Sequence, residues 1–450
     1  MQKYESLPID QLIRPEGFDC ECGLHHGVDL KYLKIAPGAV NHVGDAVRAV
    51  GCKKPFIICD KNTYEAAAKK VSSVLESENI PHTVFVIPQG DLNKLEPDER
   101  ALGSIAMTYD TSCDMIIAVG SGVINDLSKV FSYDLGVPQM IVGTAPSMDG
   151  FASNSSSMVV NGVKTTLYNR CPAAIVLDID IMKNAPMRML WAGLGDMVAK
   201  YISLCEWRIA HLVIGEYYCE HVAELMRNAL KRIMAYSDGL KDRSAEAVQA
   251  VSEGLVLSGM AMSFAKVSRP ASGLEHYFSH MWEMLALERG EESELHGIQV
   301  GVGTCLTMKI YEDIKKLTPS MEKGIAAMKA FDKETWEARV RRVFGKTAEA
   351  VLEIEEKTHK NDPEKHAKRL ENIIQNWDEI LKIISEELPD AEWLFEKMRV
   401  NGMPMKPEDI NLTHQDVVDA FVCSRDIRDK YLSGSMLWDL GEMDEFAERL

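Results

Sequence analysis

The sequence predicts an α/β domain built on a parallel sheet, followed by an all-helical domain. Up to residue 180, short apolar runs alternate with amphipathic helical patterns, and this alternation implies a parallel sheet covered on both faces. After residue 186 nearly every segment has helical periodicity and strand signals stop. A chain of 450 residues is also too long for one ordinary core. We therefore place an α/β domain at 1–183 and a helical domain at 184–450.

The expected strands and helices follow in chain order. Short runs that are rich in β-branched residues and bounded by turn residues predict buried strands, at 55–60, 83–88, 115–120 and 139–146. Residues 64–77 and 98–109 between them predict amphipathic helices, and 160–168 with 173–180 predict two more strands that are close enough in sequence for a hairpin. Helices are predicted at 191–212, 216–237 and 246–266, and the charged stretch 345–400 predicts exposed helices.

Charge and composition exclude several classes of function. The net charge of −18 argues against nucleic acid, whose phosphate backbone requires a basic surface. No run of eighteen apolar residues predicts a membrane span, and the N-terminus lacks the apolar core of a signal peptide. We expect a cytoplasmic protein. An anionic ligand would then need local cations, backbone N–H groups or a metal to hold it.

The ten cysteines form no regular framework, and most are expected to be reduced and buried. One cluster, DCECGLHH, places Cys20, Cys22, His25 and His26 within seven residues. Its C-x-C spacing is tighter than that of common structural zinc motifs. A turn-rich segment with packed thiols is therefore the favoured interpretation, and a zinc site is the alternative.

A glycine-rich turn follows the strand predicted at 115–120. In AVGSGVINDLSK, small residues lie between a strand and a helix, where backbone N–H groups and the helix N-terminus can bind a pyrophosphate. Asn125 breaks the G-x-G-x-x-G pattern, so simple helix packing is the alternative. Asp126, one turn into the helix, is either a ligand contact or a partner of the helix dipole.

Two further segments lie at predicted strand ends. Asp60 ends the strand at 55–60, where a carboxylate often binds a ribose hydroxyl, although a solvated turn is equally compatible. The polar loop TAPSMDGFASNSSS, at 144–157, follows another strand. Such loops form the binding crevice of open α/β sheets, and an ordinary connection is the alternative.

The helical half contains a candidate metal site. His276 and His280 are four residues apart on one helix face, His296 begins the next predicted helix, and Asp196 opens a helix after Gly195. A carboxylate with two imidazoles and open positions is how a catalytic Lewis-acid site is built. Histidines with no shared role are the alternative. Arg269 and Lys200 are either surface ion-pair partners or cations for an anionic substrate.

Taken together, these motifs resemble a known family. AVGSGVINDLSK, TAPSMDGFAS, GVKTT, GLGDMVAK, SRPASGLEHYFSH and LHGIQVGVG occur in this order between residues 30 and 305. They closely resemble the sn-glycerol-1-phosphate dehydrogenases, particularly the bacterial branch. That family lies within the group of iron-containing alcohol dehydrogenases and dehydroquinate synthases.

The resemblance implies a Rossmann-like domain, an all-α domain and specific site residues. It implies Asp196, His276 and His296 as ligands of one divalent metal (Ni²⁺, Zn²⁺ or Fe²⁺), with His280 and Asp149 beside the substrate. It implies cations for the phosphate at Arg269, Lys164 or Lys200. It also implies a nucleotide site formed by Asp60, Gly120, Ser121, Gly122, Val123, Ile124, Asn125, Asp126, Thr144, Ala145, Pro146, Ser147 and Ser153.

The implied reaction is the reversible reduction of dihydroxyacetone phosphate to sn-glycerol 1-phosphate by NADH or NADPH. A homodimer or larger homo-oligomer is expected, with no nucleic-acid or membrane partner. Two alternatives stay open: a metal-dependent glycerol or polyol dehydrogenase, and a non-catalytic nucleotide-binding regulator.

Overall fold

The computed structural model describes residues 4–88, 95–161 and 163–450, and the chain forms two compact units. Unit 1 comprises residues 1–197 and 220–268, and unit 2 comprises residues 198–219 and 269–450. The last strand is β10 (Ala174–Asp178), and the described chain after it contains helices and loops only. A boundary at 183 thus follows the change from strands to helices, whereas the units divide the helices between them. The boundary itself stays a prediction.

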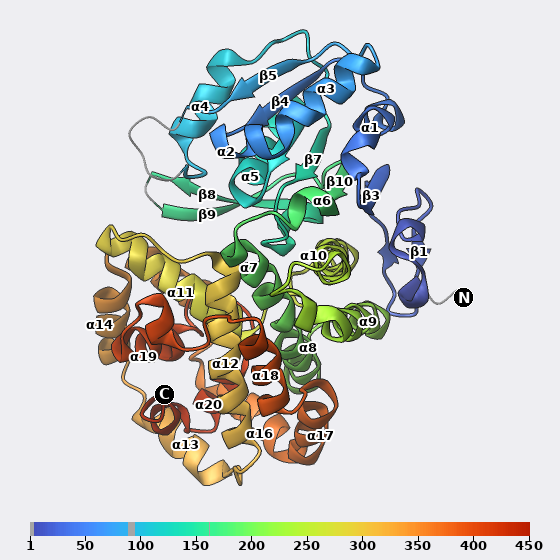
Figure 1. Cartoon of the computed structure of the whole chain (residues 1–450). Coiled ribbons are helices and arrows are strands. Elements are labelled where there is room, and N and C mark those ends of the chain that lie inside the picture. The colour runs from blue at the N-terminus through green and yellow to red at the C-terminus, as the bar shows by residue number, and fades with distance from the viewer. Residues whose placement is uncertain (1–3, 89–94, 162) are drawn as a thin grey trace. The chain divides into compact units, whose positions relative to one another are not determined.

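Unit 1 is built on a six-stranded sheet whose strands all pair in parallel, as predicted. The order is β3-β10-β7-β6-β4-β5 (Figure 1). The bounds are β3 Tyr32–Ala36, β4 Pro55–Cys59, β5 Thr83–Val86, β6 Met115–Gly120 and β7 Gln139–Gly143, with β10 as given above. The four interior strands β10, β7, β6 and β4 consist of buried residues, as expected for a sheet covered on both faces.

The strand order places a crevice at one edge of the sheet. From β4 the chain runs outward to β5, and it then returns to form β6 on the other side of β4. The carboxyl ends of β4 and β6 therefore flank a topological switch point, which is where open α/β sheets bind their ligands. Asp60 follows β4, and the glycine-rich turn follows β6.

The predicted hairpin of 160–168 with 173–180 is wrong. The hairpin joins β8 (Ser155–Val160) to β9 (Val163–Tyr168), whereas β10 lies in the main sheet between β3 and β7. The 144–157 loop therefore ends in a strand that the sequence did not indicate. Gly162, which belongs to the GVKTT motif, lies outside the described residues.

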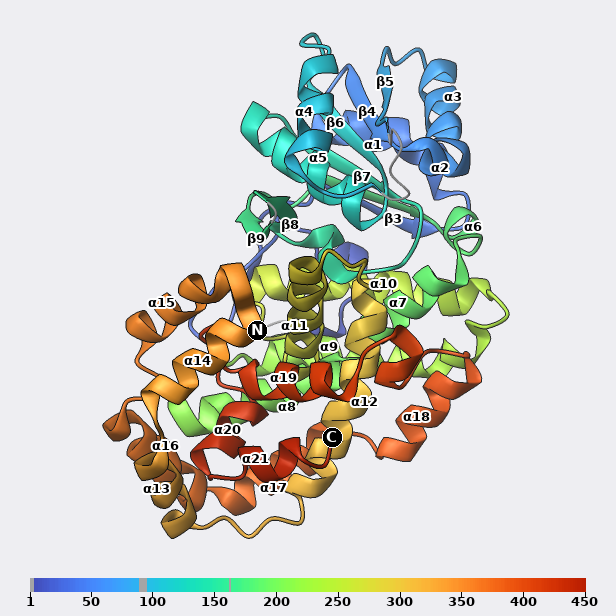
Figure 2. The same ribbon diagram turned by 90° about the vertical axis from the view of Figure 1, so that its left-hand side faces the viewer.

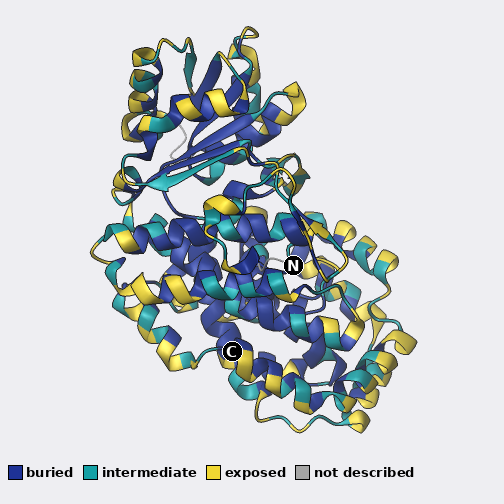
Figure 3. Ribbon diagram, turned by 90° about the vertical axis from the view of Figure 1, so that its right-hand side faces the viewer, coloured by how far each residue is buried: buried dark blue, intermediate teal, exposed yellow. Residues whose placement is uncertain are grey.

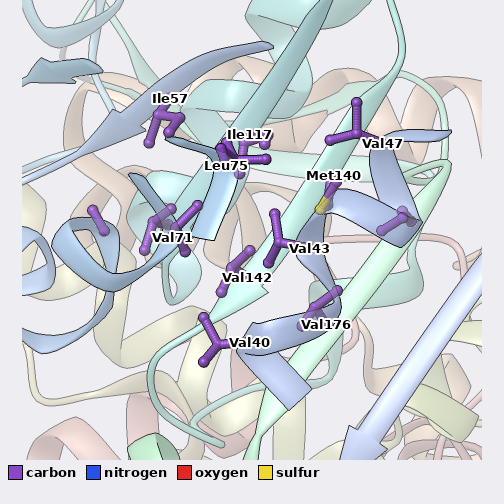
Figure 4. Close-up of a cluster of buried hydrophobic side chains, with 14 of the residues drawn as sticks. Val40, Val43, Val47, Ile57, Val71, Leu75, Ile117, Met140, Val142 and Val176 are labelled. Atoms are coloured by element: carbon purple, nitrogen blue, oxygen red, sulfur yellow. The ribbon is translucent and has the colours of Figure 1, made fainter. Parts of the chain in front are cut away.

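The core beneath the sheet is aliphatic. Figure 4 shows aliphatic side chains that belong to this core, among them Leu75 next to Ile117 of β6 and Val47 next to Met140 of β7. Valine and isoleucine suit strands buried on both faces. Figure 3 colours the residues by burial. Most of the central strands are buried, and many outer helical turns are exposed.

The helices of unit 1 are α1 (Val43–Val50), α2 (Lys61–Thr63), α3 (Lys69–Ser77), α4 (Glu99–Thr108), α5 (Gly122–Leu135), α6 (Ile179–Met182), α7 (Met187–Val198), α9 (Glu220–Tyr236) and α10 (Ala245–Ala265). A π-helical stretch at Tyr64–Ala68 precedes α3, so the helix predicted at 64–77 is present. Helix α10 is long and apolar enough to cross a membrane, but 78% of its apolar window is buried within the protein. Its apolar character is that of a core helix.

The described residues of unit 2 form helices joined by loops and turns. Its α-helices are α8 (Lys200–Ile214), α11 (Leu274–Arg289), α12 (His296–Ile314), α13 (Met321–Ala330), α14 (Lys333–Phe344), α15 (Ala348–Thr358), α16 (Pro363–Gln375), α17 (Trp377–Glu387), α18 (Ala391–Val400), α19 (His414–Cys423), α20 (Ser433–Asp439) and α21 (Met443–Ala447). Helices α11 and α12 pack side by side (Figures 1 and 2). The helices predicted at 345–400 are exposed on one face only, because residues such as Leu370, Ile380 and Leu394 are buried.

Candidate active site

Asp60 and the glycine-rich turn lie at the carboxyl ends of β4 and β6 in unit 1, where a nucleotide can bind. Asp60 caps α2, and its Oδ1 accepts a hydrogen bond of 2.8 Å from the Thr63 N–H. Its second carboxylate oxygen has no such role in the cap, so it can accept a bond from a ribose hydroxyl. Ser121 occupies the N-cap position of α5 but makes no side-chain cap there. The first N–H groups of α5 are therefore available to an anion.

The turn is shaped by close packing as well as by ligand access. A Cβ on Gly120 would lie 2.6 Å from the Ile124 Cβ, so glycine is required for α5 to pack against β6. At Gly122 the nearest atom would be 3.7 Å away, which is an ordinary contact. Of the four residues that follow, Ile124 and Asn125 are buried and Val123 and Asp126 are partly exposed. Val123 and Asp126 are thus the ones that can face a ligand.

Asp126 and Asn125 also bond to neighbouring loops. Asp126 Oδ2 accepts a hydrogen bond of 3.1 Å from the Ser157 N–H, and burial raises the pKa of this carboxyl against the opposing charges of Lys129 and Lys164. Asn125 Nδ2 donates to Gly150 O at 3.3 Å. These bonds tie α5 to the 144–157 loop, part of which the resemblance implies for the nucleotide site.

That loop begins beside the glycine turn. The Thr144 N–H donates to Gly120 O at 3.0 Å, and Ser147 Oγ lies 2.5 Å from Ser121 Oγ. Ala145 between them is buried. The structure therefore brings the two predicted nucleotide segments together, at the carboxyl ends of the neighbouring strands β6 and β7.

Ser153, in contrast, is held by a lysine that the sequence analysis missed. Lys129 is 1% exposed, and its ammonium donates to Gly150 O, Ser153 O, Ser153 Oγ and Ser155 O at 2.7 to 3.2 Å. Ser153 Oγ itself donates to Gly150 O at 3.0 Å. Lys129 thus fixes the loop from the inside. Its position in the DLSK end of a recognised motif was the available signal.

Replacing Lys129 with methionine should lower the free energy of unfolding by about 3 kcal/mol, because several buried carbonyl oxygens lose their donor. Lys183→Met is the matched control. Lys183 pairs with Asp180 at the surface, so its loss should cost less than about 1 kcal/mol. Urea unfolding of both variants measures the difference, and equal losses would contradict the role given to Lys129.

Asp149 and Asp196 lie together in unit 1. The Asp149 N–H donates to Asp196 Oδ2 at 2.9 Å, and Asp149 Oδ2 accepts from Ser258 Oγ at 2.8 Å. A Cβ on Gly193 would lie 1.8 Å from Pro146 O, so this glycine lets α7 approach the loop. The sequence suggested that Asp196 opens a helix, and this is wrong. Residues 192–195 (AGLG) belong to α7, so Asp196 lies near the end of that helix.

The three histidines lie together in unit 2. His276 and His280 are on α11, and His296 is the first residue of α12. Ring centroids are 5.4 Å apart for His276 and His296 and 5.6 Å apart for His280 and His296. The helix spacing that the sequence indicated therefore does bring these imidazoles into one cluster.

Two glutamates set which ring nitrogen faces the cluster. Glu275 Oε1 lies 2.8 Å from His276 Nδ1, and Glu283 Oε1 lies 3.2 Å from His296 Nδ1. Ser279 Oγ also lies 3.0 Å from His296 Nδ1. In the tautomer in which these oxygens accept, each Nδ1 carries the proton and each Nε2 keeps a lone pair that a metal could use. Glu275 directly precedes His276, and Glu283 follows His280 by three residues, so the sequence itself places both glutamates close to histidines.

Glu283 could also be read as a ligand. Ligand atoms of His280, Glu283 and His296 lie within 4.8 Å of one another. Glu283 reaches His296 through Nδ1, however, and its Oε2 is 3.7 Å from His280 Nδ1. The closer contact, 3.2 Å to His296 Nδ1, is the one that can orient an imidazole.

Burial shapes the charges around this cluster. Burial lowers the pKa of His280 well below its usual value, and the charge of Arg428 lowers it further. Burial also raises the pKa of Glu275 to about 8, with the charge of Glu206 as a second cause. Glu275 Oε2 is buried and accepts no hydrogen bond from the part of the chain that the structure describes. A cation bound nearby would favour the charged form of Glu275 and could pair with its Oε2, so the residues present fit a divalent metal.

The predicted cations lie in different surroundings. Arg269 is 1% exposed, and its guanidinium bonds both carboxylate oxygens of Glu216 and, at 3.0 Å, Tyr431 O. Lys200 is buried and donates to Ala271 O at 3.0 Å. Lys164 lies exposed on β9 in unit 1. The charge of Arg269 is thus already neutralised by a carboxylate within its own unit.

Two cations that the sequence analysis missed lie near His280. Arg428 is exposed, and its charge acts on His280, Tyr277 and Lys430. Lys430 Nζ donates to Ser272 O at 3.2 Å and lies 5.9 Å from the centre of the Tyr277 ring. Burial, then Arg269 and Arg428, lowers the pKa of Lys430 to about 7. No local pattern in SRDIRDKYLSG marks these residues, because their place follows from the helical packing of unit 2.

Comparison with known proteins places this arrangement in context. Residues 34–186 match the family model of iron-containing alcohol dehydrogenases. A glycerol-1-phosphate dehydrogenase of Halalkalibacterium halodurans is 33% identical over 66% of this chain and 74% of its own length. One of Pyrococcus furiosus is 34% identical over 62% of this chain and 77% of its own.

Solved structures of lower identity share the fold. A glycerol dehydrogenase from Schizosaccharomyces pombe superposes with a TM-score of 0.59 at 14% identity, over 93% of this chain and 90% of the other. A maleylacetate reductase from a Rhizobium strain gives a TM-score of 0.57 at 12% identity, over 93% and 95% of the two chains. The expected fold, a Rossmann-like domain with an all-α domain, is thereby confirmed.

Proposed function

We propose, since the chain belongs to the glycerol-1-phosphate dehydrogenase family, that it reduces dihydroxyacetone phosphate to sn-glycerol 1-phosphate with NADH or NADPH. The observation that carries the proposal is the histidine pair of unit 2. His276 and His296 both keep Nε2 for a metal because Glu275 and Glu283 hold Nδ1. A substrate ketone needs such a Lewis-acid centre for hydride reduction.

Asp196, His276 and His296 would hold the metal, as the resemblance implies. Asp196 belongs to unit 1 and the histidines to unit 2, so the complete ligand set rests on the resemblance to the family. When bound, the metal polarises the ketone oxygen and stabilises the negative charge that develops there. Nickel, zinc and iron(II) all accept this donor set. The glutamates fix the imidazole orientation in advance, which lowers the cost of reorganisation during the reaction.

Unit 1 would bind the dinucleotide at the switch point of its sheet. Asp60 offers a carboxylate oxygen to the adenosine ribose, and the N–H groups of α5 offer hydrogen bonds to the pyrophosphate. Thr144 and Ser147 lie beside that turn and would line the nicotinamide end. The cofactor supplies the hydride, and these residues position it.

The phosphate of the substrate would lie against Arg428 and Lys430. Both are near His280, and the negative charge of a phosphate requires local cations in a chain of net charge −18. Arg269, whose charge Glu216 neutralises, would support this region from behind. His280, which we assign to the substrate, would relay a proton to the new hydroxyl from solvent.

A nicotinamide absorbance assay tests the proposal. The metal-stripped enzyme should be inactive with dihydroxyacetone phosphate, and restoring nickel, zinc or iron(II) should restore NADH consumption. Dihydroxyacetone and glycerol are the comparison substrates. The product should be sn-glycerol 1-phosphate by an enantiomer-specific assay. Faster turnover of the unphosphorylated substrates would instead support a polyol dehydrogenase, and no turnover of any of them would support a nucleotide-binding regulator.

The phosphate site predicts a specific pH dependence. Lys430 is charged below its pKa of about 7 and neutral above it, so the KM for dihydroxyacetone phosphate should rise as pH increases through 7. Bound phosphate favours the charged lysine and moves the midpoint upward. Lys430→Met should raise this KM roughly tenfold at low pH, in line with a lost charge-assisted hydrogen bond.

Lys430→Arg separates charge from other effects, because arginine stays protonated throughout this range. It should flatten the pH dependence of KM. Dihydroxyacetone, which has no phosphate, should show no corresponding rise with the wild-type enzyme. A pH profile that is the same for both substrates would remove Lys430 from the phosphate site.

The expected homo-oligomer belongs to the same proposal and is measured by light scattering.

A further inference from the structure

The N-terminal hairpin brings together soft metal ligands that the proposed reaction does not use. Strand β1 (Phe18–Asp19) pairs with β2 (His25–His26) in an antiparallel hairpin. The turn between them is closed by bonds from Cys20 N to Leu24 O and from Gly23 N to Cys20 O, at 3.2 and 3.1 Å. Ligand atoms of Cys20, Cys22 and His26 lie within 4.8 Å of one another, and Cys22 Sγ is 3.3 Å from His26 Nε2.

The His26 ring is oriented as a metal ligand would be. It is fully buried, and its Nδ1 lies 2.7 Å from the carbonyl oxygen of Phe264 on α10. A carbonyl can only accept, so Nδ1 carries the proton and Nε2 turns a lone pair toward Cys22. Metal-bound histidines are typically held in this way by a backbone carbonyl.

His25, the neighbouring residue, provides an internal contrast. Successive side chains in a strand point to opposite faces, so His25 points outward and is exposed. It bonds Asp19 at 2.8 Å, away from the thiols. Only one of the two adjacent histidines therefore belongs to the cluster.

The surroundings of the cluster also suit a bound metal. Tyr4 OH lies 3.6 Å from Cys20 Sγ, within the range of a hydroxyl that donates to sulfur. The rings of Phe18 and Phe264 pack against Tyr4, at centroid distances of 4.9 and 5.9 Å. Cys20 is buried in this apolar shell, whereas Cys22 is partly exposed. A hydrogen bond to a ligand sulfur helps to stabilise its thiolate form.

A fourth ligand is available from chain connectivity. Cys219 is bonded to Glu220, the first residue of α9, so their Cα atoms are about 3.8 Å apart. Helix α9 packs against the N-terminal segment within unit 1. Asn228 Nδ2 donates to Glu5 O at 3.2 Å, and His221 Nδ1 lies 3.2 Å from Glu5 Oε2. The start of α9, and with it Cys219, is thereby held next to this segment.

We propose that Cys20, Cys22, His26 and Cys219 bind a structural zinc ion, separate from the metal of the proposed active site. Three thiolates and one imidazole form a closed tetrahedral set, which is typical of structural rather than catalytic zinc. On binding, each thiol releases its proton to solvent, and no redox step is involved. The ion joins the N-terminal hairpin to α9 and α10. The tight C-x-C spacing argued against such a site, and the sequence did not indicate its fourth ligand, which is 193 positions further along the chain than His26.

The test separates this ion from the catalytic metal. In a His296→Ala background the catalytic site has lost a ligand, so zinc that remains after dialysis is assigned to the hairpin. Elemental analysis should find one zinc per chain in this background. Adding Cys22→Ser should remove it, whereas adding His25→Ala, on the outer face of the same hairpin, should leave it in place.

Cobalt provides a readout that does not depend on a cysteine variant folding. The His296→Ala protein, stripped and refilled with Co²⁺, should show the near-ultraviolet charge-transfer band of cobalt thiolates. Absence of both zinc and this band would overturn the proposal, as would zinc that stays unchanged in Cys22→Ser. Neither readout uses enzymatic activity, so the result is independent of the proposed function.

Discussion

Replacing His276 with alanine is expected to abolish metal retention and to lower kcat/KM for dihydroxyacetone phosphate by about a thousandfold or more. In the proposal, His276 is one of two imidazole ligands, and its ring centroid lies 5.4 Å from that of His296. Metal polarisation of a carbonyl contributes several kcal/mol to the transition state, and about 4 kcal/mol corresponds to a roughly thousandfold change in rate. Dialysis followed by elemental analysis, together with the absorbance assay, measures both effects.

Glu283→Gln is the informative comparison, because Glu283 is the other residue that could be read as a ligand. If it only orients His296, glutamine keeps an oxygen that can accept from Nδ1, and metal affinity should fall by about 10- to 100-fold. Complete loss of metal in Glu283→Gln together with full retention in His276→Ala would reverse the two assignments. Circular dichroism and urea unfolding of both variants show whether the fold is intact.

The parallel sheet was predictable because its signals are local. Runs such as PFIICD and MIIAVG are buried on both faces, so their composition alone marks them as strands. Strand β8 was missed because SSSMVV begins with three serines, which favour loops. Its place depends on β9 and on the bonds of Lys129 to Ser153 O and Ser155 O. Contacts between residues that are far apart in sequence leave no periodic pattern.

The same distinction applies to the candidate site. The i, i+4 spacing of His276 and His280 is a local feature, and it predicted the histidine cluster that unit 2 contains. The pairing of Arg269 with Glu216 was not predictable, because the two residues are 53 positions apart. Arg428 and Lys430 are more than 140 positions from His280 in the sequence. Their relation to it arises only when the helices of unit 2 pack.

Asp196→Asn is expected to remove the metal while leaving the fold of unit 1 intact. The carboxylate of Asp196 has two roles in the proposal: its Oδ2 accepts a hydrogen bond of 2.9 Å from the Asp149 N–H, and its charge would bind the metal. An asparagine oxygen can still accept the bond from Asp149. It carries no charge, however, and neutral amide oxygens are weaker ligands for nickel, zinc and iron(II) than carboxylates.

The expected loss of metal affinity in Asp196→Asn is therefore larger than the about 10- to 100-fold typical of an outer hydrogen-bond partner. NADH binding, measured by fluorescence titration, should change less than about threefold, because Asp60 and the turn after β6 are untouched. Asp196 lies in unit 1 and His276 in unit 2, so the double variant is decisive. If one ion needs both residues, Asp196→Asn should cause little further loss once His276 is absent. Independent, additive losses would mean that the two residues serve different sites, and the proposed metal-assisted reduction would lose its centre.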